Sequence, residues 1–433
     1  MAAALTCLCC CACGGGGRPA TGLPAPAGGS VPAPGFGGPG PLGRPAIGLS
    51  EDNAQLLLDP ATAPGQRWAS SAPAFQRGRR ELAALQPEYI RLLVDWAALQ
   101  PRADDPPELG LAVSGCARTV GPCGPYPGLS GELAAIASQQ RARRAAGRAG
   151  PEVLIDILGA PAWASAQPSG CELAGAASSA RALAPSAIPA YRQLVAALLS
   201  LARSEGVHVR WWSPWNEPND ALFINPQRMS CDPASSPVAP SLYAQLARAM
   251  AGVLHASAPT ASIVLGELDG FTSDSAHATS VGSFVASLPA DVVCLASAWS
   301  VHAYASYGSD ARATDPVAAL ERALSRRGGC AGASPLWITE TGAGAPRPGD
   351  PTDGSTARQL EACRALAGRL AGWFADPRVG AVFQYTFRDD PAFPVGLASA
   401  DLRTLHPTYT LWLSLGRVRV GATSRAPSPE VCR

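Results

Sequence analysis

Two glutamates in similar local settings are the residues of this sequence that could carry out a reaction as a pair. Glu217 lies just after the strand-like run 209–213, in Trp215-Asn216-Glu217-Pro218, and Glu340 ends the run Leu336-Trp337-Ile338-Thr339. Glycoside hydrolysis needs two facing carboxyl groups, because one protonates the departing oxygen and the other supports an oxocarbenium-like centre. Either glutamate alone would be interpreted as a solvated loop residue, so the hypothesis concerns the pair.

The elements that must position this pair alternate along the chain as short apolar runs and stretches of helical periodicity. We expect eight strands, at Ala46–Leu49, Tyr89–Val94, Val153–Leu158, Val209–Ser213, Ser262–Leu265, Ala298–His302, Leu336–Thr339 and Ala381–Thr386. Helices are expected between them, among them Glu132–Ala149, Ile188–Ser204, Ser241–Ala256, Pro316–Arg327 and Thr356–Phe374. Eight such units predict an α/β fold, a (β/α)₈ TIM barrel that forms a single catalytic domain over residues 45–416. A doubly wound open sheet is the alternative, but no Gly-x-Gly-x-x-Gly follows the first strand.

The carboxyl ends of the strands form the active face of a parallel barrel. The fourth and seventh strands lie on opposite sides of an eight-stranded barrel, so the side chains at their ends can meet across its mouth. The topology therefore predicts that Glu217 and Glu340 face each other.

The motifs around these residues resemble those of the clan A retaining glycoside hydrolases, which include families 5 and 39. Trp215-Asn216-Glu217-Pro218 is similar to the acid/base signature of the clan, and the segment 337–342, Trp-Ile-Thr-Glu-Thr-Gly, is similar to its nucleophile signature. Further matches are Ile90-Arg91-Leu92, the segment 300–304, Ser-Val-His-Ala-Tyr, and the segment 159–163, Gly-Ala-Pro-Ala-Trp, which is closer to family 39. The resemblance spans residues 46–416, although outside the motifs it concerns architecture.

The resemblance implies a double displacement with retained configuration. Glu340 attacks the anomeric carbon, while Glu217 protonates the leaving oxygen and then activates water, which requires carboxyl groups about 5–5.5 Å apart. Arg91 is expected beside Glu340 to keep it ionised, and Asn216 is expected to bind the sugar 2-hydroxyl. His302 and Tyr304 are expected to orient the carboxylates. A rim salt bridge for Arg91 and core positions for His302 and Tyr304 remain the alternatives.

The substrate-binding surface departs from the clan pattern on the last strand. Clan members commonly place a tryptophan there beneath the sugar, whereas this chain has Tyr385 and Phe387. We predict that Tyr385 and Trp163 contact an oligo- or polysaccharide, with a β-linked glycan implied by the resemblance. Two of the five tryptophans at 163, 211, 212, 215 and 299 are expected to face substrate. Glu267 and Asp269 are expected to be solvent-facing, and the cluster 388–390 either contacts sugar or forms ion pairs at the rim.

Composition narrows the chemistry further. The 433 residues carry a formal net charge of +1, so no global field attracts nucleic acid. All 34 basic residues are arginine, which removes Schiff-base and P-loop lysine chemistry. The five histidines show no His-x-x-x-His zinc spacing, and no cofactor or metal is predicted. A transglycosylase that uses the same intermediate, and a glycan-binding barrel without turnover, are the alternative functions.

The 13 cysteines form two groups. Five lie within residues 1–13, a short apolar segment that is typical of an export or lipoprotein signal with Cys13 as the lipid-anchored residue and membrane tether; low-complexity sequence is the alternative. Residues 14–44 are rich in Gly and Pro and predict a linker, and 417–433 are expected to be a tail held by Cys432. The other eight cysteines predict disulfides in an oxidising compartment, with Cys116–Cys123 the easiest pair. Together these features predict a secreted protein or a cell-surface lipoprotein.

Overall fold

The computed structural model describes residues 44–59, 66–116, 121–305, 315–344, 356–390, 393–416 and 427–433. These all belong to one compact unit, Gly37–Arg433. The predicted signal segment, the linker up to residue 43 and residues 417–426 of the tail lie outside the described residues. Within the described chain, no helix combines the length and the apolar character needed to cross a membrane.

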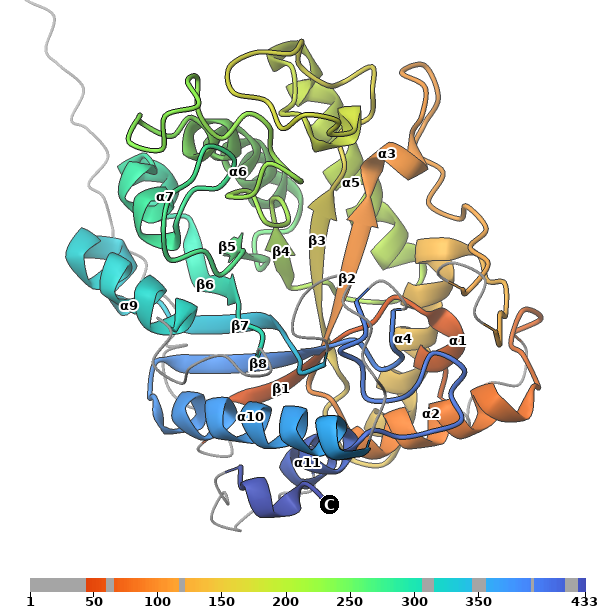
Figure 1. The fold of residues 1–433 in the computed structure, drawn as a ribbon. Coiled ribbons are helices and arrows are strands. Elements are labelled where there is room, and N and C mark those ends of the chain that lie inside the picture. The colour runs from red at the N-terminus through yellow and green to blue at the C-terminus, as the bar shows by residue number, and fades with distance from the viewer. Residues whose placement is uncertain are drawn as a thin grey trace, which may run out of the picture. The chain divides into compact units, whose positions relative to one another are not determined.

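The strands close into an eight-stranded parallel barrel in the order β1 to β8, which confirms the predicted fold (Figure 1). Closure comes from β1 pairing with β8, with Gly48 beside Phe383. The strands are β1 Ala46–Ser50, β2 Tyr89–Asp95, β3 Glu152–Leu158, β4 Trp211–Ser213, β5 Ser262–Leu268, β6 Ala296–His302, β7 Leu336–Thr341 and β8 Val379–Tyr385. Among the strands, the largest difference from the predicted bounds is in β5, which continues three residues past Leu265 because the chain passes through Gly266 without leaving the sheet.

Helices follow the strands, and two of them, α5 and α9, have the predicted bounds. The α-helices are α1 Ala54–Leu57, α2 Pro73–Leu85, α3 Trp96–Leu99, α4 Gly128–Ala145, α5 Ile188–Ser204, α6 Ala239–Ser257, α7 Val281–Ser287, α8 Ala290–Val293, α9 Pro316–Arg327, α10 Thr356–Ala375 and α11 Pro407–Gly416. The start of α9 shows why its bounds are readable from the sequence: Asp315 accepts a hydrogen bond from the Val317 N–H, and Pro316 occupies the first turn.

The barrel interior is filled at its amino-terminal end by an apolar cluster. This cluster consists of Ala46, Leu154, Trp211, Val264, Ala298, Trp337, Ala381 and Phe383, with Tyr89 packed against it. The Trp211 and Trp337 rings lie 4.5 Å apart between centroids. A second, larger cluster fills the space between strands and helices and contains Trp212, Trp215 and Trp299. The expectation that two of the five tryptophans face substrate is therefore wrong, because Trp163 is the one among them that is not buried.

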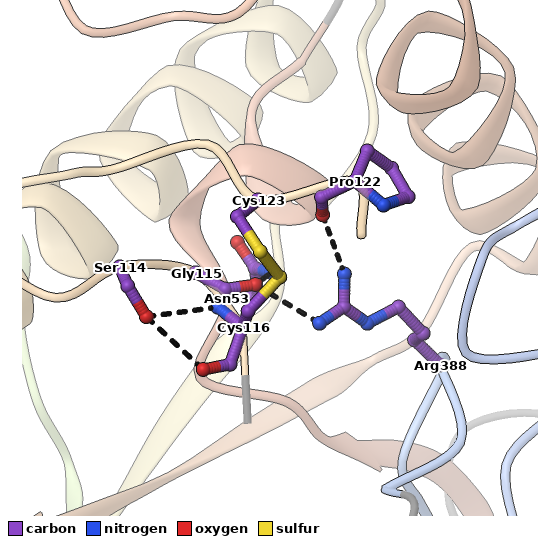
Figure 2. Close-up of a disulfide and its surroundings, with 7 residues drawn as sticks. All are labelled: Asn53, Ser114, Gly115, Cys116, Pro122, Cys123 and Arg388. Atoms are coloured by element: carbon purple, nitrogen blue, oxygen red, sulfur yellow. Dashed lines mark hydrogen bonds between the residues drawn. A yellow bond between two sulfur atoms is a disulfide. The ribbon is translucent and has the colours of Figure 1, made fainter. Parts of the chain in front are cut away.

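Four disulfides join the eight cysteines beyond the first 13 residues: Cys116–Cys123, Cys171–Cys231, Cys294–Cys330 and Cys363–Cys432. The first pair and the tethering of the tail by Cys432 were both expected. Figure 2 shows how the Cys116–Cys123 loop, which follows β2, is held by residues that follow two other strands. Arg388, after β8, donates to the carbonyls of Pro122 and Gly115 at 2.9 Å each, and Asn53, after β1, donates to the Gly115 carbonyl at 3.2 Å. Arg388 therefore joins loops at the rim.

Gly48 is required by the packing of the barrel interior. A Cβ built on Gly48 would lie 2.2 Å from Cδ1 of Phe383, a fully buried ring. Gly48→Ala should therefore destabilise the fold by about 1–3 kcal/mol, the usual cost of overpacking a core. Gly252→Ala is the matched control: Gly252 lies in α6 with no atom within 4 Å of an added Cβ, so alanine should raise stability by up to about 1 kcal/mol. Urea unfolding with the disulfides intact measures both, and equal midpoints for the two variants would contradict this packing account.

Candidate active site

Arg91 on β2 is the centre of a polar network inside the carboxyl-terminal end of the barrel. The side chain is fully buried. Its Nη1 donates to Glu340 Oε1 at 2.6 Å and to Ser50 Oγ at 3.0 Å, and its Nη2 donates to Asp156 Oδ2 at 2.7 Å and Asn216 Oδ1 at 2.8 Å. The guanidinium thus joins side chains from or just after β1, β3, β4 and β7. The rim salt bridge considered for Arg91 is wrong, since the ion pairs lie inside the barrel.

Glu340 is held in place by three neighbouring side chains. Besides Arg91, it accepts a hydrogen bond from the hydroxyl of Tyr304, and its Oε2 lies 3.6 Å from His302 Nδ1. The side chain is 8% exposed, at the mouth of the barrel. Arg91 and Tyr304 are therefore where they were expected, on the two oxygens of this carboxylate.

Glu217 lies across from Glu340 and is tied to the same histidine. Its Oε1 lies 2.6 Å from His302 Nδ1. One carboxylate oxygen of Glu217, one of Glu340 and a ring nitrogen of His302 all lie within 4.8 Å of one another. Glu217 has a positive φ of 40°, and its N–H donates to the Glu267 carbonyl at 2.9 Å. A non-glycine residue in this region is strained, and such residues are concentrated at functional sites.

Glu267 is the main residue that the sequence interpretation misplaced. It was expected to face solvent, but it is fully buried. The cause is local: Gly266 has φ 112°, a Cβ there would lie 2.3 Å from the Ser300 carbonyl oxygen, and the β5–β6 register shifts at this point. Such a bulge re-aims the following side chain. Glu267 consequently enters the barrel, where Oε1 accepts a hydrogen bond from Ser300 Oγ at 3.0 Å.

Asp156 is a second residue that the sequence interpretation did not identify, and a signal for it was available. It is a charged residue in the middle of the apolar run that forms β3, and it is fully buried against Arg91. A carboxylate in such a run requires a buried partner. Asp269, by contrast, is half-buried rather than solvent-facing.

Burial and neighbouring charges shift the pKa values of these buried groups in different directions. Burial alone would lower the pKa of His302, but the carboxylates of Glu340, Glu217 and Glu267 outweigh it and raise the pKa well above its usual range. Burial would raise the pKa of Glu267, yet Arg91, followed by His302 and Ser300, lowers it to about 2. Burial and the neighbouring Glu267 raise the pKa of Asp156 well above its usual range. These directions favour the protonated form of His302, the ionised form of Glu267 and the neutral form of Asp156.

The remaining predicted substrate contacts lie around this centre. Tyr385 lies beside Tyr304, with ring centroids 6.4 Å apart, whereas Phe387 is fully buried. Of the two aromatic residues considered for the last strand, Tyr385 is therefore the one that lies beside the site residues. Trp163 is half-buried, packs edge-on against Trp96 at 5.7 Å and donates from Nε1 to the Gln100 carbonyl. None of the interactions described for Trp163 links it to Arg91 or to the two glutamates.

Two side-chain groups of the described chain have spacing that could suit a cation: the set Glu217, His302 and Glu340, and the set Glu217, Asp220 and Asp269. In the first set, both ring nitrogens of His302 lie against carboxylates, at 2.6 and 3.0 Å. A doubly protonated imidazole has no lone pair for a metal. The arrangement can instead hold and move protons.

No protein-family model matches this chain, and no curated protein matches it. Among solved structures it is similar to SrfJ from Salmonella typhimurium, with 9% identity and a TM-score of 0.54 over 87% of this chain and 75% of that chain. It is also similar to a conserved exported protein from Bacteroides fragilis, with 13% identity and a TM-score of 0.51 over 87% and 79%. A third is the catalytic domain of GH30 xylanase C from Talaromyces cellulolyticus, with 12% identity and a TM-score of 0.50 over 86% and 75%. At these identities the likeness concerns the barrel fold, and it does not single out family 5 or family 39.

Removal of the Arg91 charge should cost stability as well as function. Arg91→Met keeps the length of the side chain but leaves Glu340 and Glu267 without their buried counter-charge. Breaking such a pair costs about 3–5 kcal/mol, measurable by urea unfolding. The control is Arg248→Met, because Arg248 and Asp291 form an exposed pair with 46% and 63% of their side chains accessible; its unfolding midpoint should stay close to that of the wild type. If the two substitutions cost the same, the charge network is not what stabilises this end of the barrel.

Proposed function

We propose that this protein is a retaining glycoside hydrolase in which Glu340 is the nucleophile and Glu217 the acid/base residue. The observation that supports this most directly is the approach of the two carboxylates, with oxygens within 4.8 Å of each other. Retaining enzymes have carboxyl groups about 5–5.5 Å apart, whereas inverting enzymes need about 6.5–9.5 Å to admit a water. The short separation favours direct attack of Glu340 on a sugar held between the two.

In the first step, Glu340 forms a bond to the anomeric carbon as the glycosidic bond breaks and the leaving oxygen takes a proton from Glu217. Arg91 and Tyr304 orient Glu340 by donating hydrogen bonds to its two oxygens. In this proposal Arg91 and His302 carry two positive charges, and Glu267 and Glu340 carry two negative charges. The cluster is therefore neutral when Glu217 carries a proton. The imidazolium donates from Nδ1 to Glu217 Oε1. The proton that is transferred must therefore sit on Oε2.

In the second step, Glu217 removes a proton from water, the oxygen attacks the anomeric carbon, and the bond to Glu340 breaks. Glu340 is uncharged while it is esterified, so a negative charge on Glu217 then has one repulsive neighbour fewer. Asn216 is held by Arg91 through its Oδ1, which orients its amide nitrogen for the sugar 2-hydroxyl. The product keeps the configuration of the substrate, and every step uses side chains and water.

The substrate in this proposal is a β-linked oligo- or polysaccharide, and Tyr385 forms part of the surface beneath the sugar. The motif resemblance to clan A supports this class, and so does the xylanase named among the structural neighbours. The four disulfides support an oxidising, extracellular location. A lipid anchor at Cys13 remains a prediction on residues outside the described chain.

The test is a panel of aryl β-glycosides assayed with variants of the two glutamates. Glu340→Gln should lower kcat by about 10⁴-fold or more on every substrate. Glu217→Ala should lower kcat/KM by about 10²–10⁴-fold where the leaving group needs protonation and by much less with 2,4-dinitrophenyl glycosides. With the latter, kcat should fall because the second step lacks its base, and azide should restore turnover by giving the β-glycosyl azide.

Glu321→Gln is the matched control for these variants. It makes the same change of charge on α9, where Glu321 lies 3.7 Å from Arg378 on the outside of the barrel, and it should keep wild-type rates. Full activity in Glu340→Gln would refute the proposed function.

A further inference from the structure

A single oxygen of Glu267 lies between the two cations of the site. Glu267 Oε2 is 2.8 Å from Arg91 Nη2 and 3.0 Å from His302 Nε2. Arg91 in turn holds Glu340 at 2.6 Å, and His302 holds Glu217 at 2.6 Å. Glu267 therefore connects the partner of the proposed nucleophile to the partner of the proposed acid, although it touches neither glutamate through its own side chain.

A strained backbone is needed to hold Glu267 Oε2 in this position. Glu267 has a positive φ of 50°, and the residue before it must be glycine because a Cβ would overlap the Ser300 carbonyl. Ser300 fixes both ends of the residue, since its Oγ accepts from the Glu267 N–H at 2.7 Å and donates to Oε1 at 3.0 Å. Strained, fully buried carboxylates are retained where the surroundings over-determine them. This points to a role for the charge itself.

We propose that Glu267 is the positioning residue that keeps His302 doubly protonated and thereby places the transferable proton of Glu217 on Oε2. The inference extends the proposed function and depends on it. With Glu267 ionised, both ring nitrogens of His302 carry protons, Nε2 donates to Glu267 and Nδ1 donates to Glu217 Oε1. Oε2 is then the remaining oxygen of Glu217 that can carry a proton for the leaving group.

Without the charge of Glu267, the same residues adopt a different proton arrangement. A neutral amide at position 267 accepts from Nε2–H, which leaves Nδ1 of a neutral imidazole as an acceptor. The proton of Glu217 then moves to Oε1, toward His302 and away from the substrate. The groups that bear on the titration of His302 come from every neighbouring strand end: Asp156, Glu217, Glu267, Asp269 and Glu340 as acids, and Arg91 as the base beyond Glu267.

The experiment compares Glu267→Gln with the wild type on glycosides that differ in leaving group. Glu267→Gln should lower kcat/KM by about 10²-fold for 4-methylphenyl glycosides, which need the acid, and by less than about 10-fold for 2,4-dinitrophenyl glycosides. The alkaline limb of its pH profile should move to lower pH, because His302 loses its proton earlier once the anion is removed. If Glu267 had only a structural role, the substitution would lower kcat/KM equally for both substrates and leave the alkaline limb of the pH profile unchanged.

A second readout is independent of turnover. In protein labelled with ¹⁵N-histidine, with His302→Gln used to assign the signal, His302 should carry protons on both nitrogens at pH 7 in the wild type and on one nitrogen in Glu267→Gln. Asp274→Asn is the control: Asp274 follows the same strand and pairs with the buried Arg228 at 2.8 Å. It should behave like the wild type in both the leaving-group comparison and the spectrum.

The inference is overturned if His302 is neutral in the wild type at pH 7, or if Glu267→Gln leaves both the spectrum and the leaving-group dependence unchanged. Where Glu267→Gln does not fold, Glu267→Asp serves instead, because the shorter side chain keeps the negative charge but holds it farther from His302. It should shift both readouts in the same direction by a smaller amount, and the absence of a shift overturns the inference. A wild type without glycosidase activity refutes the proposed function instead, while the spectrum still tests the role of Glu267.

Discussion

The buried guanidinium of Arg91 is the constraint on which the rest of the site depends. A charge removed from water must be compensated by partners at hydrogen-bond distance, and this one has its anionic and polar partners on strands all around the barrel, with Glu340 at 2.6 Å and Asp156 at 2.7 Å. Because these strands are fixed by the closed sheet, the partners have little freedom to move. The position of the proposed nucleophile is thus a consequence of barrel closure.

The interior of the barrel is divided into an apolar floor and a polar upper layer. The division follows the two-residue period of the strands: Leu154 is followed by Asp156 on β3, Trp211 by Ser213 on β4, Ala298 by Ser300 on β6 and Trp337 by Thr339 on β7. The apolar members stabilise the fold, and the polar members line the end where the glutamates lie. The positive φ values of Glu217 and Glu267 also occur at this end, so two of the strained backbone positions lie in the layer that the apolar floor supports.

The sequence was sufficient for the fold and for the approach of Glu217 to Glu340, because both depend on periodicity and on the places where apolar runs end. It was insufficient for Glu267, since the predicted fifth strand ends at Leu265 and only the sheet register reveals a bulge. The tryptophans were misjudged for a related reason. Trp211 and Trp212 are adjacent, point to opposite sides of the sheet and are both buried, so residue type alone could not exclude them from the substrate surface. Asp156 was predictable from its apolar neighbours, and the N-terminal predictions concern residues outside the described chain.

In the proposed mechanism, a sugar is attached to Glu340 between two inversions at the same carbon. The most direct test follows the anomeric proton of the first-formed sugar by ¹H NMR during rapid hydrolysis of an activated β-glycoside. We expect the β-anomer to appear first and then to mutarotate to the equilibrium mixture. Initial appearance of the α-anomer would mean that water attacks directly, and it would contradict the proposed arrangement of the two carboxylates.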